Sequence, residues 1–332
     1  MNAAAPGAAA PLEALVTGSA GFIGGHTVRA LLDAGWAVTA LDVAECPPWM
    51  ASAVGVVRAE ADDPRTLNDV RDGRYAAVIH QGAISSTLAD DWDRLSEVNV
   101  RQPLALAEAA AAGRARFVYA SSHSVYGTIR RRVAVTEAQA TDTSVCTGPL
   151  NLYARSKLVL DQEMVRRYAK APRWFALRYT NVFGQGEEHK GGMASIISQL
   201  LRSAAEGRQL RVFADTLNAC RDYIPVENVA RTVVRLAGQE TEGGIYNLGS
   251  ASPVSFATLL QWCADFSTAD ALDVRLVQNP IPDRYQYWTC ADQSRLEAAL
   301  PGAGPVSLDE VKAAAARLFT HFRARTLEGV HA

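Results

Sequence analysis

A glycine-rich turn near the start of the chain constrains the fold more than any other stretch. The apolar run Ala14–Thr17 leads directly into residues 18–24, which read Gly-Ser-Ala-Gly-Phe-Ile-Gly, and a helical pattern follows over His26–Ala34. A strand, a glycine turn and a helix in that order are what a dinucleotide-binding fold requires. The stretch therefore predicts a strand and a helix that meet at a phosphate-binding turn.

The individual glycines and one carboxylate support this interpretation. Gly18 permits the tight turn, Gly21 lets the backbone approach a pyrophosphate, and Gly24 lets the helix pack closely on the strand. The next predicted strand, Ala37–Leu41, ends at Asp42. A carboxylate about 20 residues beyond the glycines accepts hydrogen bonds from the adenosine ribose. Asp42 is therefore a candidate cofactor ligand, and the alternative is a simple turn residue at a strand end.

Strand and helix patterns keep alternating through the first half of the chain. Further strands are expected at Val54–Arg58, Ala76–His80, Arg116–Ala120 and Trp174–Arg178, with helices at Pro64–Val70, Leu88–Ala112 and Asn151–Ala169. This order predicts an α/β fold with a doubly wound parallel Rossmann sheet over residues 12–180. Residues 181–326, where the alternation loosens, are expected to form mainly a smaller mixed α/β substrate domain, with some segments returning to the Rossmann core. Residues 1–11, almost all Ala, Pro and Gly, are expected to be a disordered tail.

Composition and charge argue against several functional classes. A net charge of −2 over 332 residues gives no electrostatic reason to expect nucleic acid or an anionic membrane as a partner. The five cysteines are scattered and the six histidines show no metal-ligand spacing, so no metal site is expected. No stretch reaches the ~18 apolar residues of a membrane span. These features predict a cytoplasmic protein with reduced thiols.

Tyr153 and Lys157 carry the central catalytic signal. They stand four residues apart in a helical stretch, which puts both side chains on one face. A phenol titrates near ~10 in water, so it serves as a base at neutral pH only if a cation such as Lys157 favours the phenolate. The phenol oxygen would take a proton while hydride leaves the same carbon. Taken alone, the spacing also fits a half-buried tyrosine beside a solvated lysine.

Other polar residues follow predicted strands, where ligands of such folds bind. Ser122, after the fifth strand, is the best candidate to hydrogen-bond the reacting oxygen, and Asp62, after the third, could meet the adenine. The small residues in His80-Gln81-Gly82-Ala83 leave room for a cofactor, although His80 itself fits a core histidine better. On chemistry alone, Lys190 is best interpreted as an exposed loop lysine. Thr128–Leu150 has little periodicity and is expected to be a lid or an insertion.

Several motifs resemble known enzymes. Three of them together resemble the extended short-chain dehydrogenase/reductase superfamily, which includes the nucleotide-sugar epimerases: Gly18 to Gly24, Ser122 with Tyr126-Gly127, and Tyr153 with Lys157. Three more stretches are similar to the ADP-L-glycero-D-manno-heptose 6-epimerase family: residues 80–87, 188–195 and 284–292. The most specific contains His189-Lys190-Gly191, which ordinary 4-epimerases do not usually carry. The likeness spans nearly the whole chain.

The resemblance implies a reaction and a set of site residues. In that family the cofactor oxidises C6 of the heptose to a ketone, the side arm turns over, and hydride returns to the other face. This implies Tyr153 and Lys190 as the two acid/base groups, with Lys157 on the nicotinamide ribose and Ser122 on the substrate hydroxyl. The implied cofactor-binding residues are Gly18, Gly21, Phe22, Ile23, Gly24, Asp42, Asp62, His80, Gln81, Gly82, Ala83, Asn99, Tyr153, Lys157, Val182 and Lys190. The implied substrate-binding residues are Ser122, Asn181, Gly192, Gln199, Phe213, Arg221 and Tyr285, with Arg221 a partner for the diphosphate.

The chain departs from the family pattern at three places. After Asp42 the family usually has an Asn and then a Lys that suits a 2′-phosphate, whereas this chain continues Val43-Ala44-Glu45, which favours NAD over NADP. Gly192 and Gln199 stand where the family usually has Ser and His, and Thr128–Leu150 fits the pattern poorly. The exact sugar and nucleotide therefore stay open, as does a heptose route to a specialised metabolite instead of lipopolysaccharide.

Alternative functions remain open from the sequence. A nucleotide-sugar 4-epimerase would need Tyr153 but could leave Lys190 idle, and a related heptose-modifying enzyme is possible. A 4,6-dehydratase is less favoured, because such enzymes commonly carry Asp-Glu where this chain has His123-Ser124. A catalytically silent dinucleotide-sensing protein would need the glycines but not the Ser-Tyr-Lys trio. The family implies a nucleotide-diphospho-heptose as substrate and a homo-oligomer whose order the sequence does not fix.

Overall fold

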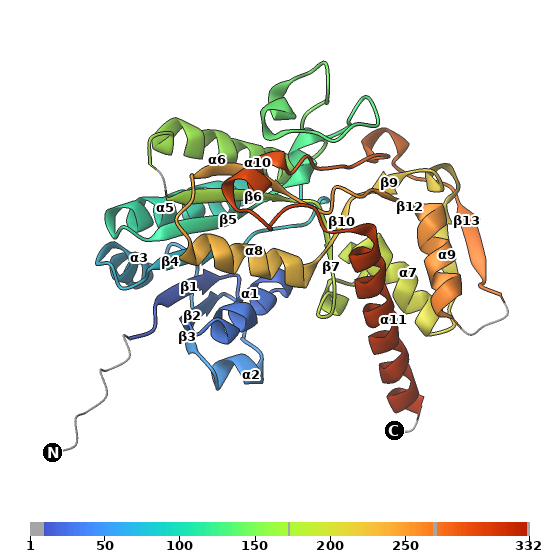
Figure 1. Cartoon of the computed structure of the whole chain (residues 1–332), viewed down its shortest axis with the longest axis horizontal. Helices are drawn as coiled ribbons and strands as arrows, with labels where there is room; N and C mark the ends of the chain where they lie inside the picture. The colour runs from blue at the N-terminus through green and yellow to red at the C-terminus, as the bar shows by residue number, and fades with distance from the viewer. Residues whose placement is uncertain (1–9, 172, 268–270, 331–332) are drawn as a thin grey trace.

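A seven-stranded parallel sheet forms the centre of the molecule (Figure 1). The computed structural model describes residues 10–171, 173–267 and 271–330, so the predicted tail lies outside the described residues except for Ala10 and Pro11. The strand order is β11-β6-β5-β4-β1-β2-β3, which confirms the predicted doubly wound sheet. The strands are β1 (Glu13–Thr17), β2 (Ala37–Asp42), β3 (Gly55–Arg58), β4 (Ala77–His80), β5 (Arg116–Ser122), β6 (Trp174–Tyr179) and β11 (Gly244–Leu248).

Helices cover both faces of this sheet because its strands are apolar on both sides. Ala14 and Val16 of β1 belong to one buried apolar cluster and Leu15 to another, since successive side chains of a strand face opposite sides. The first face is covered by α1 (Phe22–Asp33), α2 (Pro48–Ala51) and α8 (Val226–Gly238). The second is covered by α3 (Pro64–Arg71), α5 (Gln102–Ala112) and α6 (Leu152–Tyr168). The short α4 (Trp92–Ser96) leads through a π-helical turn, η1 (Glu97–Arg101), into α5.

The strand order reverses beside β1, which pairs with β2 on one side and β4 on the other. Open α/β sheets bind ligands at such a switch point, in the crevice outside the carboxyl ends of the strands. Gly18 follows β1 and Gly82 follows β4, and the two glycine backbones are in close contact there. The topology therefore places the glycine turn at the edge where a cofactor is expected.

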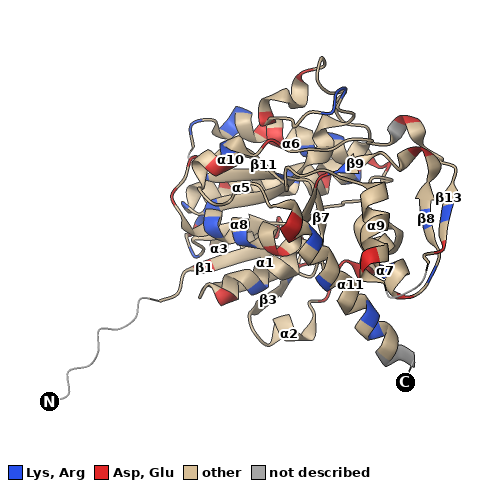
Figure 2. Cartoon of the chain, turned by 45° about the vertical axis from the view of Figure 1, so that its right-hand side comes forward, with Lys and Arg blue, Asp and Glu red and all other residues tan. Residues whose placement is uncertain are grey.

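The second half of the chain builds a smaller lobe at the right of Figures 1 and 2. Its strands form three pairs: β7 (Asn181–Phe183) with β10 (Tyr223–Pro225), β8 (Leu210–Phe213) with β13 (Val274–Val277), and β9 (Cys220–Arg221) with β12 (Val254–Ser255). Its helices are α7 (Ile196–Ala205), α9 (Phe256–Phe266) and α11 (Leu308–Val330), while α10 (Ser294–Ala299) packs beside β11. Leu200, Leu259 and Leu318 of this lobe belong to the same apolar cluster as one face of the sheet. The two halves therefore share a continuous core.

Residues 128–150 form a packed insertion above the sheet in Figure 1. A short 3-10 helix, η3 (Glu137–Thr141), lies within it, and isolated bridges join Ile129 to Cys146 and Val135 to Ala291. The insertion contributes to a small separate core made by Val125, Tyr126, Ile129, Val135, Ala140 and Cys146. Low periodicity in the sequence therefore reflects short, irregular contacts around a real core.

Both signs of charge are interspersed over the surface. In Figure 2, Lys/Arg and Asp/Glu segments alternate along the visible helices and loops. Among the described ranges, no helix combines the length and apolarity that crossing a membrane takes. The last helix, α11, runs to Val330.

Candidate active site

One cavity of about 720 Å³ opens at the carboxyl edge of the sheet and brings most of the predicted site residues together. The predicted residues that line it are Gly18, Gly21, Phe22, Ile23, Gly24, Asp42, His80, Gln81, Gly82, Ala83, Ser122, Tyr153, Lys157, Val182 and Lys190. Eight other predicted residues lie outside its lining: Asp62, Asn99, Asn181, Gly192, Gln199, Phe213, Arg221 and Tyr285. The cavity therefore joins residues from both halves of the chain.

The glycine turn is fixed by contacts between backbone segments. Gly18 has φ +67°, and a Cβ added to it would lie 2.3 Å from the Gly82 nitrogen. A Cβ on Gly24 would lie 2.0 Å from the Gly18 carbonyl oxygen. Neither position can hold a side chain without moving the backbone. Gly21 precedes α1 without a side-chain cap, so the first N–H groups of the helix remain available to an anion in the cavity.

Asp42 is held at the end of β2 by two backbone N–H groups. Its Oδ2 accepts the Ala20 N–H at 2.9 Å and its Oδ1 accepts the Ala44 N–H at 2.9 Å. These bonds orient the carboxylate at the cavity edge. A cation that the sequence did not reveal lies nearby, because Arg58 pairs with Asp42 across β2 and β3 and its Nε donates to the Val43 carbonyl at 3.3 Å.

The carboxylates that follow β3 differ in their relation to the cavity. Glu60 lines the cavity, whereas Asp62 does not. The Glu60 carboxylate accepts Arg94 Nη2 at 3.2 Å and Gln102 Nε2 at 3.1 Å, and both partners also line the cavity. Asp63 caps α3 by accepting the Thr66 N–H at 2.9 Å. Glu60 and Asp62 both precede this cap within three residues, so local sequence did not separate them.

Ser122, Tyr153 and Lys157 meet in the cavity. Asn151 caps α6 by accepting the Ala154 N–H at 2.8 Å, and Tyr153 and Lys157 lie one turn apart on the helix face that borders the cavity. The Ser122 side chain, at the end of β5, lies in the same cavity lining as the Tyr153 phenol and opposes the rise that burial causes in the pKa of that phenol. It also lies 2.7 Å from the Ser124 hydroxyl, which the sequence did not single out. The hydroxyls form a continuous chain beside the phenol.

The electrostatics of this trio differ from the expectation that Lys157 favours a phenolate. The Lys157 ammonium donates to the Ala120 carbonyl at 2.8 Å. Burial raises the pKa of Tyr153, and the neighbouring Ser122 opposes this only in part. Burial also lowers the pKa of Lys157 to about 8, against the opposing charge of Asp161. Protein groups alone therefore favour the neutral phenol, because desolvation of Tyr153 outweighs the opposing effect of Ser122.

Lys190 enters the same cavity from the second half of the chain. It lies in η4 (Glu188–Met193), with its Nζ 4.6 Å from the centre of the Phe22 ring and 3.7 Å from Glu187 Oε1. The side chain is only 28% exposed, so the structure contradicts an exposed loop lysine. Burial lowers the pKa of Lys190, and the Glu187 charge opposes this shift. The environments of Tyr153 and Lys190 thus favour an acid and a base, respectively.

Asn99 and His80 both use polar atoms to bond protein groups around the cavity. Asn99 is fully buried; its Oδ1 accepts the Ile84 N–H at 2.9 Å, and its Nδ2 donates to Ile84 O and to Ser156 Oγ, each at 3.0 Å. It therefore ties the loop after β4 to α6. His80 Nδ1 lies 2.7 Å from the Thr17 hydroxyl, and burial lowers the pKa of His80 to about 3, which keeps the ring neutral.

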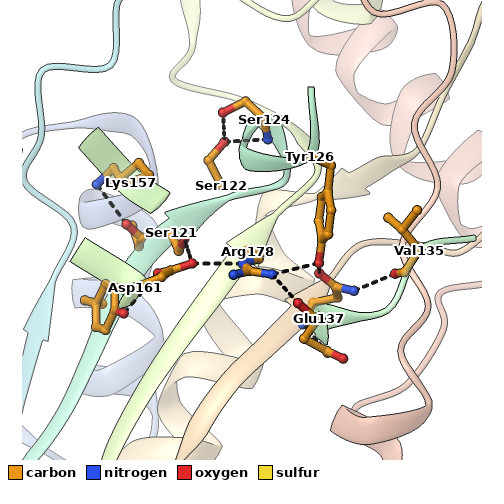
Figure 3. Close-up of polar contacts among 12 residues, drawn as sticks. Ser121, Ser122, Ser124, Tyr126, Val135, Glu137, Lys157, Asp161 and Arg178 are labelled. Atoms are coloured by element: carbon orange, nitrogen blue, oxygen red, sulfur yellow. Dashed lines mark hydrogen bonds and ion pairs between the residues drawn. The ribbon is translucent and has the colours of Figure 1, made fainter. Parts of the chain in front are cut away.

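A buried ion pair that sequence reasoning missed anchors the catalytic helix (Figure 3). Asp161, one turn beyond Lys157, accepts Arg178 Nε at 2.8 Å, and its oxygens also accept the Tyr119 and Ser121 hydroxyls at 3.0 Å. Figure 3 shows Arg178 reaching on to Tyr126 and Glu137. The network ties α6, β5, β6 and the insertion together. No local sequence pattern predicts this network, because its members come from distant parts of the sequence.

Three predicted substrate residues form a second cluster in the smaller lobe. The Arg221 guanidinium lies 4.9 Å from the centre of the Tyr285 ring, and Phe213 meets the same ring edge-on at 5.8 Å. Arg221 is 8% exposed, and its Nη1 has no hydrogen-bond partner among the described residues. A buried guanidinium with an unpaired donor and two aromatic rings suits a phosphorylated, planar ligand.

The remaining predicted substrate residues have structural partners. Asn181 Nδ2 donates to the Asp222 carbonyl at 3.1 Å, at the end where β7 and β10 begin to pair. Gln199 Nε2 donates to the Gly192 carbonyl at 3.2 Å and to the Ala194 carbonyl at 2.7 Å. Gly192 and Gln199 therefore shape the loop that carries Lys190. Within the described ranges, no group of three or more His, Cys, Asp or Glu residues could hold a metal ion.

Comparison with known proteins identifies the family. Residues 14–249 match the model of the NAD dependent epimerase/dehydratase family, which is more than half of the chain. The chain belongs to the NAD-dependent epimerase/dehydratase family. The cavity agrees with this family relationship, because its lining contains both the glycine turn typical of dinucleotide binding and the Ser-Tyr-Lys trio. The free N–H groups at the start of α1 and the Asp42 carboxylate fit the phosphates and ribose of a dinucleotide.

Several members of this epimerase/dehydratase family are similar over most of their length. An ADP-L-glycero-D-manno-heptose-6-epimerase of Alkalilimnicola ehrlichii is 32% identical over 298 residues, covering 86% of this chain and 90% of the relative. The crystal structure of the Helicobacter pylori ADP-L-glycero-D-manno-heptose-6-epimerase has TM-score 0.79 and 22% identity, over 95% of this chain and 97% of that one. A Thermus thermophilus UDP-glucose 4-epimerase in complex with NAD has TM-score 0.76 and 26% identity, over 93% and 99%.

Proposed function

We propose that this chain is an NAD-dependent epimerase that inverts C6 of an ADP-linked manno-heptose, from D-glycero to L-glycero, through a 6-keto intermediate. The observation that carries the proposal is the position of Lys190 in the same cavity as Tyr153, Ser122 and the glycine turn. Inverting a secondary alcohol by oxidation and re-reduction requires proton transfer on both faces of the carbon. Two acid/base groups from different segments supply this.

The cofactor site favours NAD. The first N–H groups of α1 would hold the pyrophosphate, Asp42 the adenosine ribose, and Lys157 the nicotinamide ribose. When bound, NAD accepts and returns the hydride. The carboxylate of Asp42 repels a 2′-phosphate, and Arg58 does not line the cavity. The family description and the Thermus thermophilus relative that was crystallised with NAD also support this choice.

The residues that move protons have separate tasks. Because burial lowers the pKa of Lys190 and raises that of Tyr153, one can accept the hydroxyl proton while the other stands ready to donate. Ser122 would hold the reacting oxygen next to the Tyr153 phenol, which lines the same cavity. Turning the keto side arm between the two groups then converts one epimer into the other without net redox change.

The cluster of Phe213, Arg221 and Tyr285 would hold the nucleotide diphosphate. An unpaired, buried guanidinium can bind a phosphate oxygen without first breaking an ion pair. Anchoring the nucleotide in the smaller lobe would leave the heptose free to reach the cavity over the sheet. The substrate class named for the Alkalilimnicola ehrlichii and Helicobacter pylori relatives supports an ADP-heptose here.

A nucleotide-sugar 4-epimerase is the second candidate. The similarity to the Thermus thermophilus UDP-glucose 4-epimerase favours it, as does the shared need for the Ser122 and Tyr153 pair. The 4-epimerase reaction does not require Lys190. A catalytically silent dinucleotide sensor would require none of Ser122, Tyr153 and Lys157. We further infer a cytoplasmic homo-oligomer; all five cysteines lie in the described ranges and each is a free thiol, as in reducing compartments.

Deuterium labelling tests the proposed reaction. Purified protein is incubated with C6-deuterated ADP-D-glycero-D-manno-heptose in ordinary water without added cofactor, and the product is followed by NMR. The L-glycero epimer should form and keep its deuterium, because the hydride stored on the cofactor returns to the same carbon. Product that has exchanged deuterium for solvent hydrogen would contradict the oxidation mechanism, and unchanged heptose with turnover of a UDP-hexose would favour the 4-epimerase.

A further inference from the structure

A buried carboxylate, Glu187, directly precedes the loop that carries Lys190. Its side chain is only 4% exposed, and its carboxylate oxygens accept several hydrogen bonds. Oε1 accepts the Ser195 N–H at 2.7 Å, and Oε2 accepts the Ser195 hydroxyl at 2.8 Å and the Ser198 hydroxyl at 2.6 Å. Ser195 is the N-cap of α7, so the carboxylate lies at the positive end of that helix. These contacts fasten Glu187 rigidly to α7.

The same carboxylate faces the Lys190 ammonium. Lys190 Nζ lies 3.7 Å from Glu187 Oε1 and 4.6 Å from the centre of the Phe22 ring. An anion and an aromatic face both favour a cation between them. The Lys190 N–H also donates to the Glu187 carbonyl at 3.1 Å, which fixes the backbone spacing of the pair. The ammonium is therefore held between the α7 anchor and the first residue of α1.

The neighbouring carboxylate has a different partner. Glu188 Oε1 lies 3.3 Å from His321 Nε2 and 3.5 Å from Arg325 Nη1, both on α11. Among the described residues, Glu187 is thus the one carboxylate that forms an ion pair with Lys190. Glu187 can therefore be tested by substitution, and the same substitution at Glu188 serves as a matched control.

Other titratable groups surround the Glu187–Lys190 pair. Tyr223 of β10 is close to Glu187, and burial raises the pKa of its phenol, so it stays neutral. Tyr153 and Lys157 of α6, together with His189, line the cavity that Lys190 enters. Burial keeps both phenols neutral, so neither could replace the Glu187 charge. The two carboxylates in the same cavity lining, Asp42 and Glu60, bond other partners, and among the described residues neither forms an ion pair with Lys190.

We propose that Glu187 is a positioning residue for Lys190, which fastens its loop to α7 and holds its charge at the cavity wall. The use of Lys190 in turnover rests on the proposed function, but the positioning does not. The Glu187 charge favours the ammonium and burial opposes it, so removing the charge leaves burial unopposed. Lys190 then loses its proton at lower pH, and the acid-side limb of the turnover profile moves the same way.

The lysine content of the chain makes a direct titration practical. The sequence has only four lysines, Lys157, Lys170, Lys190 and Lys312. Selective ¹³Cε labelling of lysine in the purified, cofactor-bound protein should give few signals, and Lys190→Arg identifies the one from Lys190. In Glu187→Gln the titration midpoint of that signal should fall by about one pH unit, since a charge at this distance contributes energies of that order. In Glu188→Gln it should stay where the parent protein has it.

The outcomes separate the positioning role from the reaction. An unchanged midpoint in folded Glu187→Gln would overturn the inference, whatever the protein catalyses. Should that variant not fold, Glu187→Asp keeps a carboxylate but withdraws it from Lys190 by one methylene group, so the Lys190 midpoint should still fall, though by less than about one pH unit; an unchanged midpoint in folded Glu187→Asp would equally overturn the inference. A midpoint that moves in Glu187→Gln while the acid limb of heptose turnover stays fixed would support the positioning and count against Lys190 as the base.

Discussion

Two glycine-bearing loops border the same cavity, and they are fixed in different ways. In the turn at residues 18–24, a Cβ on Gly18 or Gly24 would lie 2.3 Å or 2.0 Å from backbone atoms. In the loop at residues 184–192, a Cβ on Gly191 or Gly192 would meet nothing within 4 Å. Side chains hold this second loop instead, with Glu187 bound to Ser195 and Ser198.

The difference separates a general function from a specific one. Backbone sterics leave little freedom in the first loop, which suits a cofactor that every member of the family shares. Side-chain contacts in the second loop can change without moving the sheet, which suits substrate recognition. Backbone contacts thus fix the turn at residues 18–24, whereas side-chain contacts, which substitutions can change, hold the loop that carries Lys190.

The largest effect is expected in the first loop. Gly24→Ala places a methyl group against the Gly18 carbonyl, so it should abolish cofactor binding and lower the free energy of unfolding by about 3 kcal/mol or more. Gly25→Ala is the matched control, because a Cβ there would be 3.6 Å from the nearest atom, an ordinary contact. Urea unfolding and cofactor content measure both. Equal behaviour of the two variants would mean that backbone contact does not define the turn.

An intermediate effect is expected at Gly191, which has φ +53°. Gly191→Ala meets no neighbouring atom, so its cost is that of a backbone at φ +53° and ψ −123°, which residues with a Cβ rarely adopt, about 2 kcal/mol. Cofactor content should be unchanged, whereas heptose turnover should fall because the strain shifts the adjacent Lys190. Loss of bound cofactor in this variant would show that the second loop is not independent of the first.

The smallest effect on stability is expected at Gly192. Gly192→Ser enters open space at a φ outside the left-handed range, so the free energy of unfolding should stay within about 0.5 kcal/mol. The substitution restores a residue usual in the heptose epimerases that the sequence resembles. Steady-state kinetics on several ADP-heptoses would detect a change in substrate preference. A large loss of stability would contradict the open surroundings of this residue.

Local patterns in the sequence were sufficient for the cofactor edge. The glycine spacing, Asp42 at a strand end and the Tyr153 and Lys157 pair each depend on residues close together in the chain, and all line the cavity. The order of strands and helices also predicted the sheet, because apolar strands buried on both faces need helices on each side. The functional roles of these residues stay predictions.

Contacts between distant segments were not accessible in the same way. The Asp161 and Arg178 ion pair joins residues of α6 and β6 that have no characteristic spacing. Arg58 approaches Asp42 only because β2 and β3 pair in parallel. Asp62 was predicted to meet the adenine, whereas Glu60 lines the cavity. Both precede the Asp63 cap of α3 within three residues, so local sequence did not separate them.

The most direct test of the account is heptose turnover in Tyr153→Phe and Lys190→Met, with cofactor occupancy and folding measured in each variant. The account predicts that both retain the fold, and that each loses C6 inversion by about 10²–10⁴-fold at saturating cofactor, because each face of the carbon needs its own acid/base group. Turnover that survives in Lys190→Met while Tyr153→Phe loses it would contradict the two-base account and favour a reaction that leaves Lys190 idle.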